Sequence, residues 1–104
     1  FQPHLYTRTR AFAEGFAESL SHVDRLILLD IYPAREEPIP GVTSEIIFKG
    51  VTAPEKILLK KEELMDYMRS LEIGEKEVFV TVGAGDIDRF VEPIRELLEA
   101  EILR

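Results

Sequence analysis

The chain has 104 residues, which is enough for one hydrophobic core and a single domain. Its composition is 45% hydrophobic, as in a globular protein rather than a disordered one. The net charge of −7 argues against binding to nucleic acids or anionic membranes, and the absence of cysteine excludes disulfides, thiolate metal sites and cysteine nucleophiles.

The first expected elements are a helix and a buried strand. A helix from about Thr9 to Ser21 would be capped by Thr7 or Thr9. At helical spacing, one face of it carries the apolar residues Phe12, Ala13, Phe16, Ala17 and Leu20. The continuous apolar run from Arg25 to Leu29 is typical of a strand buried on both faces in a parallel sheet.

The middle of the chain combines a rigid loop with two short elements. Tyr32 to Gly41 contains three prolines and a glycine, which indicates a loop with little backbone freedom. Thr43 and the two residues after it can cap a short helix that runs through Phe48. Lys56 to Leu59 is expected to form a second short strand.

The last third predicts helix, strand, turn and helix. Lys61 to Leu71 is expected to be a helix whose inward residues are Leu64, Met65, Met68 and Leu71. Glu77 to Val82 is rich in β-branched residues and predicts a third strand, followed by a turn at Gly83 to Gly85. Pro93 fits best near the first turn of a final helix that reaches about Leu103, because a proline inside a helix costs about 3 kcal/mol.

This alternation favours an α/β domain with parallel strands and right-handed crossovers. Three polar segments follow its strands, namely His4 to Arg8, Asp30 to Ala34 and Gly83 to Asp86. Because functional residues gather at the carboxyl ends of parallel strands, we expect these segments to lie along one edge of the sheet. The chain opens on an aromatic residue without an initiator methionine, and we interpret it as part of a larger protein that begins here inside a strand.

The first polar segment holds the main binding candidates. Arg8 offers a two-pronged donor for a carboxylate, beside the N–H groups of a helix start; the alternative is a surface arginine paired with Glu14 or solvent. His4 either orients a substrate or moves a proton, or is a hydrogen-bonded loop histidine. Tyr6 is expected to shape the site, and Thr7 either donates to an anion or caps the helix.

The second and third polar segments are less specific. Asp30 ends a buried strand, where carboxylates commonly reach the edge of a site. Glu36 and Glu37 are adjacent and are interpreted as a solvated turn. The glycine turn resembles a truncated dinucleotide fingerprint, but Asp88 replaces its third glycine, so a tight structural turn is favoured over a phosphate cradle. The chain has no phosphate loop of the GxxxxGK[ST] type and no convincing zinc ligand set, and no catalytic, metal-binding or cofactor-binding residue is assigned.

Three ordered motifs carry a resemblance to a known family. They are Phe1-Gln2-Pro3-His4 with Tyr6-Thr7-Arg8-Thr9, the stretch from Asp30 to Gly41, and the stretch from Thr81 to Ile87. Together they resemble the carboxy-terminal domain of the Mur ligases that join L-alanine to UDP-N-acetylmuramate. The resemblance implies a three-layer Rossmann-like domain with a mainly parallel sheet. Residues 1–104 would be most of that amino-acid-binding domain, and its amino-terminal strands would lie upstream of Phe1.

The resemblance also implies a reaction for the parent protein. ATP would phosphorylate the carboxylate of UDP-N-acetylmuramate, and the amine of L-alanine would attack the acyl phosphate, with Mg²⁺ bridging the phosphates. ATP and Mg²⁺ would be bound mainly by an absent central domain, so the fragment alone is expected to be inactive. The expected partners are these small molecules and other domains of the same chain, with no nucleic acid and no membrane, in the cytoplasm.

By resemblance, Arg8 holds the carboxylate of L-alanine, and His4, Tyr6 and Thr7 belong to the same motif. Tyr32 and Ala34 match a family loop that faces the active-site cleft. Two positions depart from the commonest family pattern, since Leu5 replaces an arginine and Arg35 replaces a glycine. The alternatives are a peptide-recycling Mur-type ligase, a small non-catalytic α/β binding module, and a dinucleotide-binding domain.

Overall fold

The computed structural model describes residues 1–74 and 76–102. In chain order the elements are α1 (Tyr6–Leu20), β1 (Arg25–Leu29), α2 (Glu45–Phe48), β2 (Glu55–Leu59), the 3₁₀ turn η1 (Lys61–Glu63), α3 (Leu64–Ser70), the 3₁₀ turn η2 (Asp86–Phe90) and α4 (Val91–Ile102).

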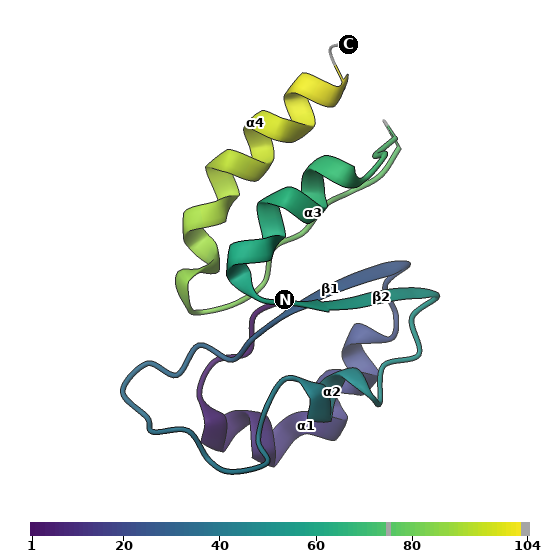
Figure 1. Ribbon diagram of the computed structural model, residues 1–104. Helices are drawn as coiled ribbons and strands as arrows, with labels where there is room; N and C mark the ends of the chain where they lie inside the picture. The colour runs from purple at the N-terminus through teal and green to yellow at the C-terminus, as the bar shows by residue number, and fades with distance from the viewer. Residues whose placement is uncertain (75, 103–104) are drawn as a thin grey trace.

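The elements form three layers, with β1 and β2 in the middle (Figure 1). The two strands are parallel, in a register that pairs Arg25 with Glu55 and Leu29 with Leu59. α3 and α4 lie on one face of the sheet, and α1 and α2 lie on the other (Figure 1). The structure therefore confirms the predicted α/β class.

Each face of the sheet has its own hydrophobic core, because side chains alternate along a strand. Toward α3 and α4 the buried residues are Ile27, Leu29, Leu59, Leu64, Met68, Ile87 and Ile94. Toward α1 and α2 they are Ala17, Leu26, Leu28, Ile47, Val51 and Ala53. β1 contributes to both cores, as its unbroken apolar run predicts, and each large side chain buried in this way stabilises the fold by about 1.5–3 kcal/mol.

The first residues of the chain extend the sheet beyond β1. The Phe1 amino group donates to the Ile27 carbonyl at 2.8 Å, and the Leu29 N–H donates to the Phe1 carbonyl at 2.9 Å. On the opposite edge, the Gln2 N–H donates to the Val82 carbonyl at 3.0 Å. Phe1 and Gln2 therefore lie in extended backbone between β1 and the segment that ends at Val82.

The start of α1 differs from the prediction. The helix begins at Tyr6, and its N-cap residue is Leu5, whose φ is 69° and whose side chain makes no capping bond. Neither Thr7 nor Thr9 is the N-cap. The Thr9 hydroxyl donates back to the Leu5 carbonyl at 2.8 Å, as hydroxyls inside helices commonly do. The unusual backbone of Leu5 turns the chain from strand to helix within one residue.

Phe12 was expected on the buried face of α1, but 58% of it is exposed. Its backbone is not helical (φ −120°, ψ 16°) and places a kink in the helix. Thr9 is fully buried, while Ala13 and Phe16 pack against the second core as predicted. The kink explains why uniform helical spacing assigned Phe12 to the wrong face.

The predicted third strand, Glu77 to Val82, is also wrong. The segment is extended but has no strand assignment in the described part of the chain, and its one bridge, just past its end, joins Gly83 to Gln2. Val78 and Val80 are 87% and 67% exposed, although Phe79 packs against the first core. The segment has the side chains of a buried strand but lacks a paired neighbour along most of its length.

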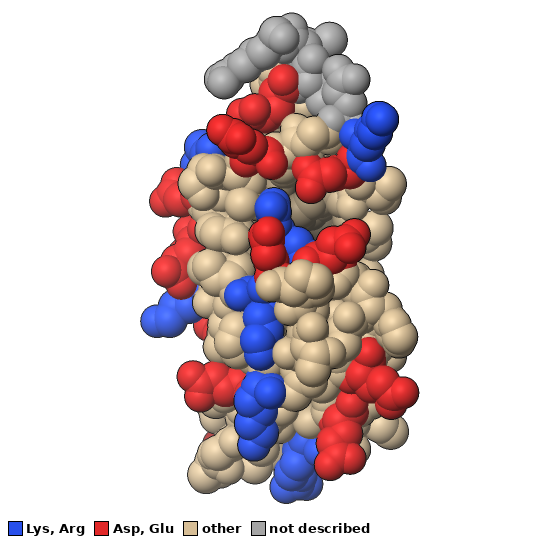
Figure 2. Space-filling view, turned by 90° about the vertical axis from the view of Figure 1, so that its right-hand side faces the viewer, with Lys and Arg blue, Asp and Glu red and all other residues tan. Residues whose placement is uncertain are grey.

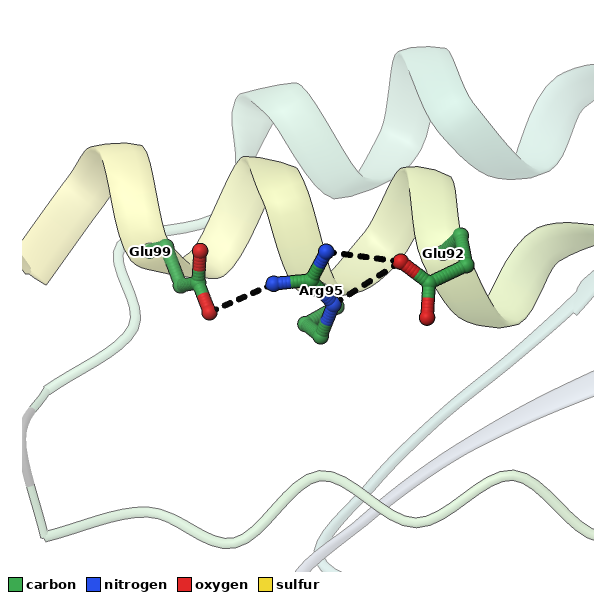
Figure 3. A network of polar contacts seen from close by, with 3 residues as sticks. All are labelled: Glu92, Arg95 and Glu99. Atoms are coloured by element: carbon green, nitrogen blue, oxygen red, sulfur yellow. Dashed lines mark hydrogen bonds and ion pairs between the residues drawn. The ribbon is translucent and has the colours of Figure 1, made fainter.

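The remaining elements match the predictions closely. α2 and β2 agree to within two residues, whereas the predicted helix from Lys61 to Leu71 divides into η1 and α3. Pro93 lies in the first turn of α4, and the predicted helix end at Leu103 falls outside the described residues. On the outer side of α4, Arg95 bonds to Glu92 and Glu99, each at 2.7 Å (Figure 3). Exposed pairs of this kind stabilise a helix by only about 0.2–0.5 kcal/mol each.

Candidate functional site: a cleft at the carboxyl edge of the sheet

A cleft of about 450 Å³ lies where the strands end. It is lined by Gln2, Tyr6, Asp30, Ile31, Tyr32, Pro33, Val42, Thr43, Ser44, Lys61, Glu62 and Asp86. All three polar segments that follow the predicted strands contribute to this lining, so they lie along one edge of the sheet, as the sequence predicts. Three of the predicted site residues line the cleft directly, namely Tyr6, Asp30 and Tyr32.

Tyr32 holds the segments of the site together. Its N–H donates to the Pro3 carbonyl at 2.8 Å, and its carbonyl accepts the Leu5 N–H at 2.9 Å. Its ring stacks on the His4 ring, with centroids 5.8 Å apart and planes at 17°. His4 is thus a half-buried side chain with a fixed ring plane beside the cleft.

The glycine turn packs directly on the Tyr32 ring. A β-carbon at Gly85 would lie 2.5 Å from Cγ of Tyr32, which no real side chain tolerates. The turn is therefore compact, as the sequence predicted. Gly85 thereby allows the backbone of the polar segment from Gly83 to Asp86 to approach the polar segment from Asp30 to Ala34.

A polar network behind the cleft joins residues that sequence reasoning did not select. Gln2 is 3% exposed; its Oε1 accepts the Ile87 N–H at 2.9 Å, and its Nε2 donates to Asp86 Oδ1 at 2.6 Å. Lys61 Nζ donates to the other Asp86 oxygen at 2.5 Å. The hydrogen bond from Lys61, followed by that from Gln2, lowers the pKa of Asp86, so this carboxyl group is an anion at neutral pH.

One local signal could have pointed to part of this network. Lys61 comes just after β2, at the same edge where Asp30 follows β1, and that position could have singled it out, although it was not predicted. Gln2 carried no such signal, because its partners Asp86 and Ile87 lie 84 and 85 residues away in the sequence.

The start of α1 already binds a carboxylate of the chain itself. Glu36 accepts the Thr7 N–H at 3.1 Å and the Thr7 hydroxyl at 2.5 Å. The Thr7 hydroxyl is the main reason that the pKa of Glu36 is lowered. Glu36 remains in a solvent-accessible turn, as interpreted from the sequence, and its carboxylate also bonds to the start of α1, whose N–H groups attract a carboxylate.

The other predicted residues lie beside the cleft rather than in its lining. Arg8 is exposed in the first turn of α1, which agrees with the alternative of a solvated surface arginine, and none of the ion pairs found among residues 1–74 and 76–102 joins it to Glu14. Ala34 is exposed and has a φ of 54°. Arg8 thus follows Thr7 in the first turn of α1 but does not line the cleft.

The described residues bear on whether this part of the chain could bind a metal ion, form a basic surface or cross a membrane. No group of three or more His, Cys, Asp or Glu side chains among them is arranged to hold a metal ion. On the face shown in Figure 2, basic side chains form a narrow line with acidic ones on both sides, and no broad basic surface is seen there. No helix in the described part of the chain is both long and apolar enough to cross a lipid bilayer.

Comparison with known proteins identifies relatives across almost the whole chain, although no protein-family model matches it. It is 65% identical over 102 residues to a UDP-N-acetylmuramate–L-alanine ligase of Parabacteroides distasonis, covering 98% of this chain and 21% of that protein. Ligases of the same name from Phocaeicola vulgatus and Porphyromonas gingivalis are 56% and 52% identical over 99 residues, covering 94% and 95% of this chain and 21% of each relative. The chain spans about one fifth of the length of these relatives. Over the length that it shares with them, the chain belongs to the UDP-N-acetylmuramate–L-alanine ligase family.

Proposed function

We propose that the chain is the amino-acid-binding part of a ligase that joins L-alanine to UDP-N-acetylmuramate in peptidoglycan synthesis, through an acyl phosphate. The observation that carries this proposal is the 65% identity, over 98% of the chain, to a ligase of that name. The motifs at the carboxyl edge of the sheet support it, because they gather at one cleft.

The geometry supports a role in holding the amino acid. The first turn of α1 already accepts a carboxylate, since the backbone and side chain of Thr7 both donate to Glu36. Arg8 follows in the same turn and offers a two-pronged donor to a second carboxylate, that of L-alanine. Asp30 lines the cleft in which the amine would lie, and His4 stacks on Tyr32 beside that cleft. Holding an amine in place against its target can lower a reaction barrier by several kcal/mol.

ATP and Mg²⁺ belong to this proposal as ligands of the longer parent protein. The residues of this chain do not fit them, because they provide no phosphate loop and no three-ligand metal set among the described side chains. The parent would bind both mainly through another domain, and the present chain would close over the nucleotide. On this proposal the chain alone is catalytically silent, and the parent works in the cytoplasm with small-molecule substrates and without nucleic acid.

The test is phosphate release by the full-length parent with ATP and UDP-N-acetylmuramate, measured with and without L-alanine. Arg8→Ala is expected to raise the KM for L-alanine at least about tenfold and to leave the KM for ATP within about twofold, since a charge-assisted pair is worth about 1.5–3 kcal/mol. Arg10→Ala is the matched control. Arg10 is also exposed in α1 but lies about 200° around the helix from Arg8.

Two outcomes would count against the proposal. Phosphate release that does not depend on L-alanine would mean that the ligase uses another amine substrate. Equal effects of Arg8→Ala on both KM values would assign Arg8 to the fold or to the nucleotide side of the site.

A further inference from the structure

The cleft at the carboxyl edge of the sheet is lined by the carboxylates of Asp30, Glu62 and Asp86. Asp30 and Glu62 are exposed, and neither takes part in an ion pair within the described part of the chain. The side chain of Asp86, by contrast, is only 10% exposed. The buried side chain of Gln2 donates to its Oδ1 at 2.6 Å. Asp86 is therefore the carboxylate of this cleft whose position the fold fixes.

The second oxygen of Asp86 binds an ammonium group that the chain itself supplies. Lys61 Nζ lies 2.5 Å from Oδ2, and this hydrogen bond raises the pKa of Lys61, so both partners are charged at neutral pH. The Lys61 side chain lines the cleft and is 47% exposed. Holding a long exposed side chain in one geometry costs conformational entropy, so ion pairs of this kind are weak. Another ammonium group that enters the cleft can therefore replace Lys61.

An amino acid brings such a group into the cleft. Its ammonium group has the same charge and the same N–H donors as that of Lys61, and the proposed function assigns its carboxylate to Arg8. An ammonium group that leaves water requires an anionic partner, because an unpaired charge is costly to bury. Asp86 offers this partner, since Gln2 still holds the carboxylate in place when Lys61 moves away.

We propose that Asp86 binds the amino group of the amino-acid substrate, and that Lys61 competes with this group for the same carboxylate oxygen. The inference rests on the proposed function and deepens it, because it assigns the amine end of the substrate. In the absence of substrate, Lys61 keeps the largely buried carboxylate paired, which avoids the cost of an isolated charge. When the substrate binds, its amino group replaces Lys61 at Oδ2, while Gln2 stays at Oδ1.

The test measures the KM values for L-alanine and ATP in the full-length parent. Lys61→Met removes the competing ammonium group and keeps the side chain long, so the KM for L-alanine should fall about twofold or more. Asp86→Asn removes the anionic partner, so the same KM should rise about tenfold or more. The KM for ATP should stay within about twofold in both variants.

The matched control is Lys60→Met. Lys60 is the neighbouring lysine and is also exposed, but it does not line the cleft. Its replacement removes the same charge and should leave the KM for L-alanine within about 1.5-fold of the wild-type value.

The opposite signs of the two effects distinguish competition from a structural role. If the ion pair only braced the fold, Lys61→Met would raise the KM for L-alanine, as Asp86→Asn does. A raised or unchanged value in Lys61→Met would overturn the inference, and so would an unchanged value in Asp86→Asn. If Asp86→Asn does not fold, Lys61→Met alone decides. Wild-type phosphate release that does not depend on L-alanine would instead overturn the proposed ligase role, and this inference with it.

Discussion

Gly85 occupies a position where no side chain fits. Gly85→Ala would place a methyl group 2.5 Å from Tyr32 Cγ and 2.7 Å from Gln2 Oε1, so we expect it to lower the free energy of unfolding by about 1–3 kcal/mol. The control is Gly15→Ala in the exposed middle of α1, where the new methyl group would meet nothing within 4 Å. That change should stabilise the fold by about 0.5–1 kcal/mol through helix propensity. Urea unfolding measures both, and an unchanged midpoint for Gly85→Ala would show that the Tyr32 ring can move aside.

At the residue scale, the sequence was informative where a contact depends on local pattern. Asp30 was predicted from its place at the end of a strand, Tyr6 from its segment and Tyr32 from the family resemblance, and all three line the cleft. Gln2 and Glu36 were not predicted as contacts, because each bonds to a segment remote in the sequence, and no periodicity encodes such a pair.

The start of α1 shows how an element can depend on a distant loop. We expect Thr7→Val to remove the main cause of the lowered pKa of Glu36, so that this pKa rises toward its ordinary value of 4.5. ¹³C NMR titration of the Glu36 carboxyl group measures the change. A matched control is Thr52→Val, at an exposed threonine in another part of the fold. An unshifted Glu36 titration in Thr7→Val would mean that the Thr7 N–H alone holds the carboxylate.

The sign of the pH effect follows from the same contact. The folded pKa of Glu36 is lower than its unfolded value, so its stabilising contribution is fully present above about 4.5 and is lost as the pH falls through the lower, folded pKa. The first turn of α1 should therefore fray in acid, before the hydrophobic cores respond.

At the scale of elements, two segments were predicted as strands from similar apolar patterns, but only one of them, β1, is a strand in the structure. β1 and the segment from Glu77 to Val82 have similar side-chain patterns, but only β1 has partners along both edges, β2 on one side and Phe1 on the other. Side-chain pattern indicates that a segment is suited to a sheet, whereas pairing depends on which backbone lies next to it. The kink at Phe12 could not be predicted from the sequence either, because an assignment by helical spacing assumes a straight helix.

At the scale of the whole 104-residue chain, prepared by itself with a free amino group at Phe1, the fold should become more stable as the pH rises from about 6 to 8. Burial lowers the pKa of the Phe1 amino group from 8.0 to about 6 in the folded state. Between these values the unfolded chain binds a proton that the folded chain does not, so the free energy of unfolding increases with pH, by up to about 3 kcal/mol. The chain acetylated at Phe1 should lack this increase. Urea unfolding of both forms across the range measures the difference, and parallel curves would contradict the assignment.

The backbone conformation of Leu5 limits which residues can replace it. Its φ of 69° is uncommon for any residue with a side chain and is most costly for those branched at the β-carbon, because their second substituent crowds the backbone. Arginine, which the resembling family commonly has here, and leucine are both unbranched at that carbon. An arginine and a leucine can therefore both take this backbone conformation and exchange charge for apolar surface, whereas valine, isoleucine and threonine are strongly disfavoured there.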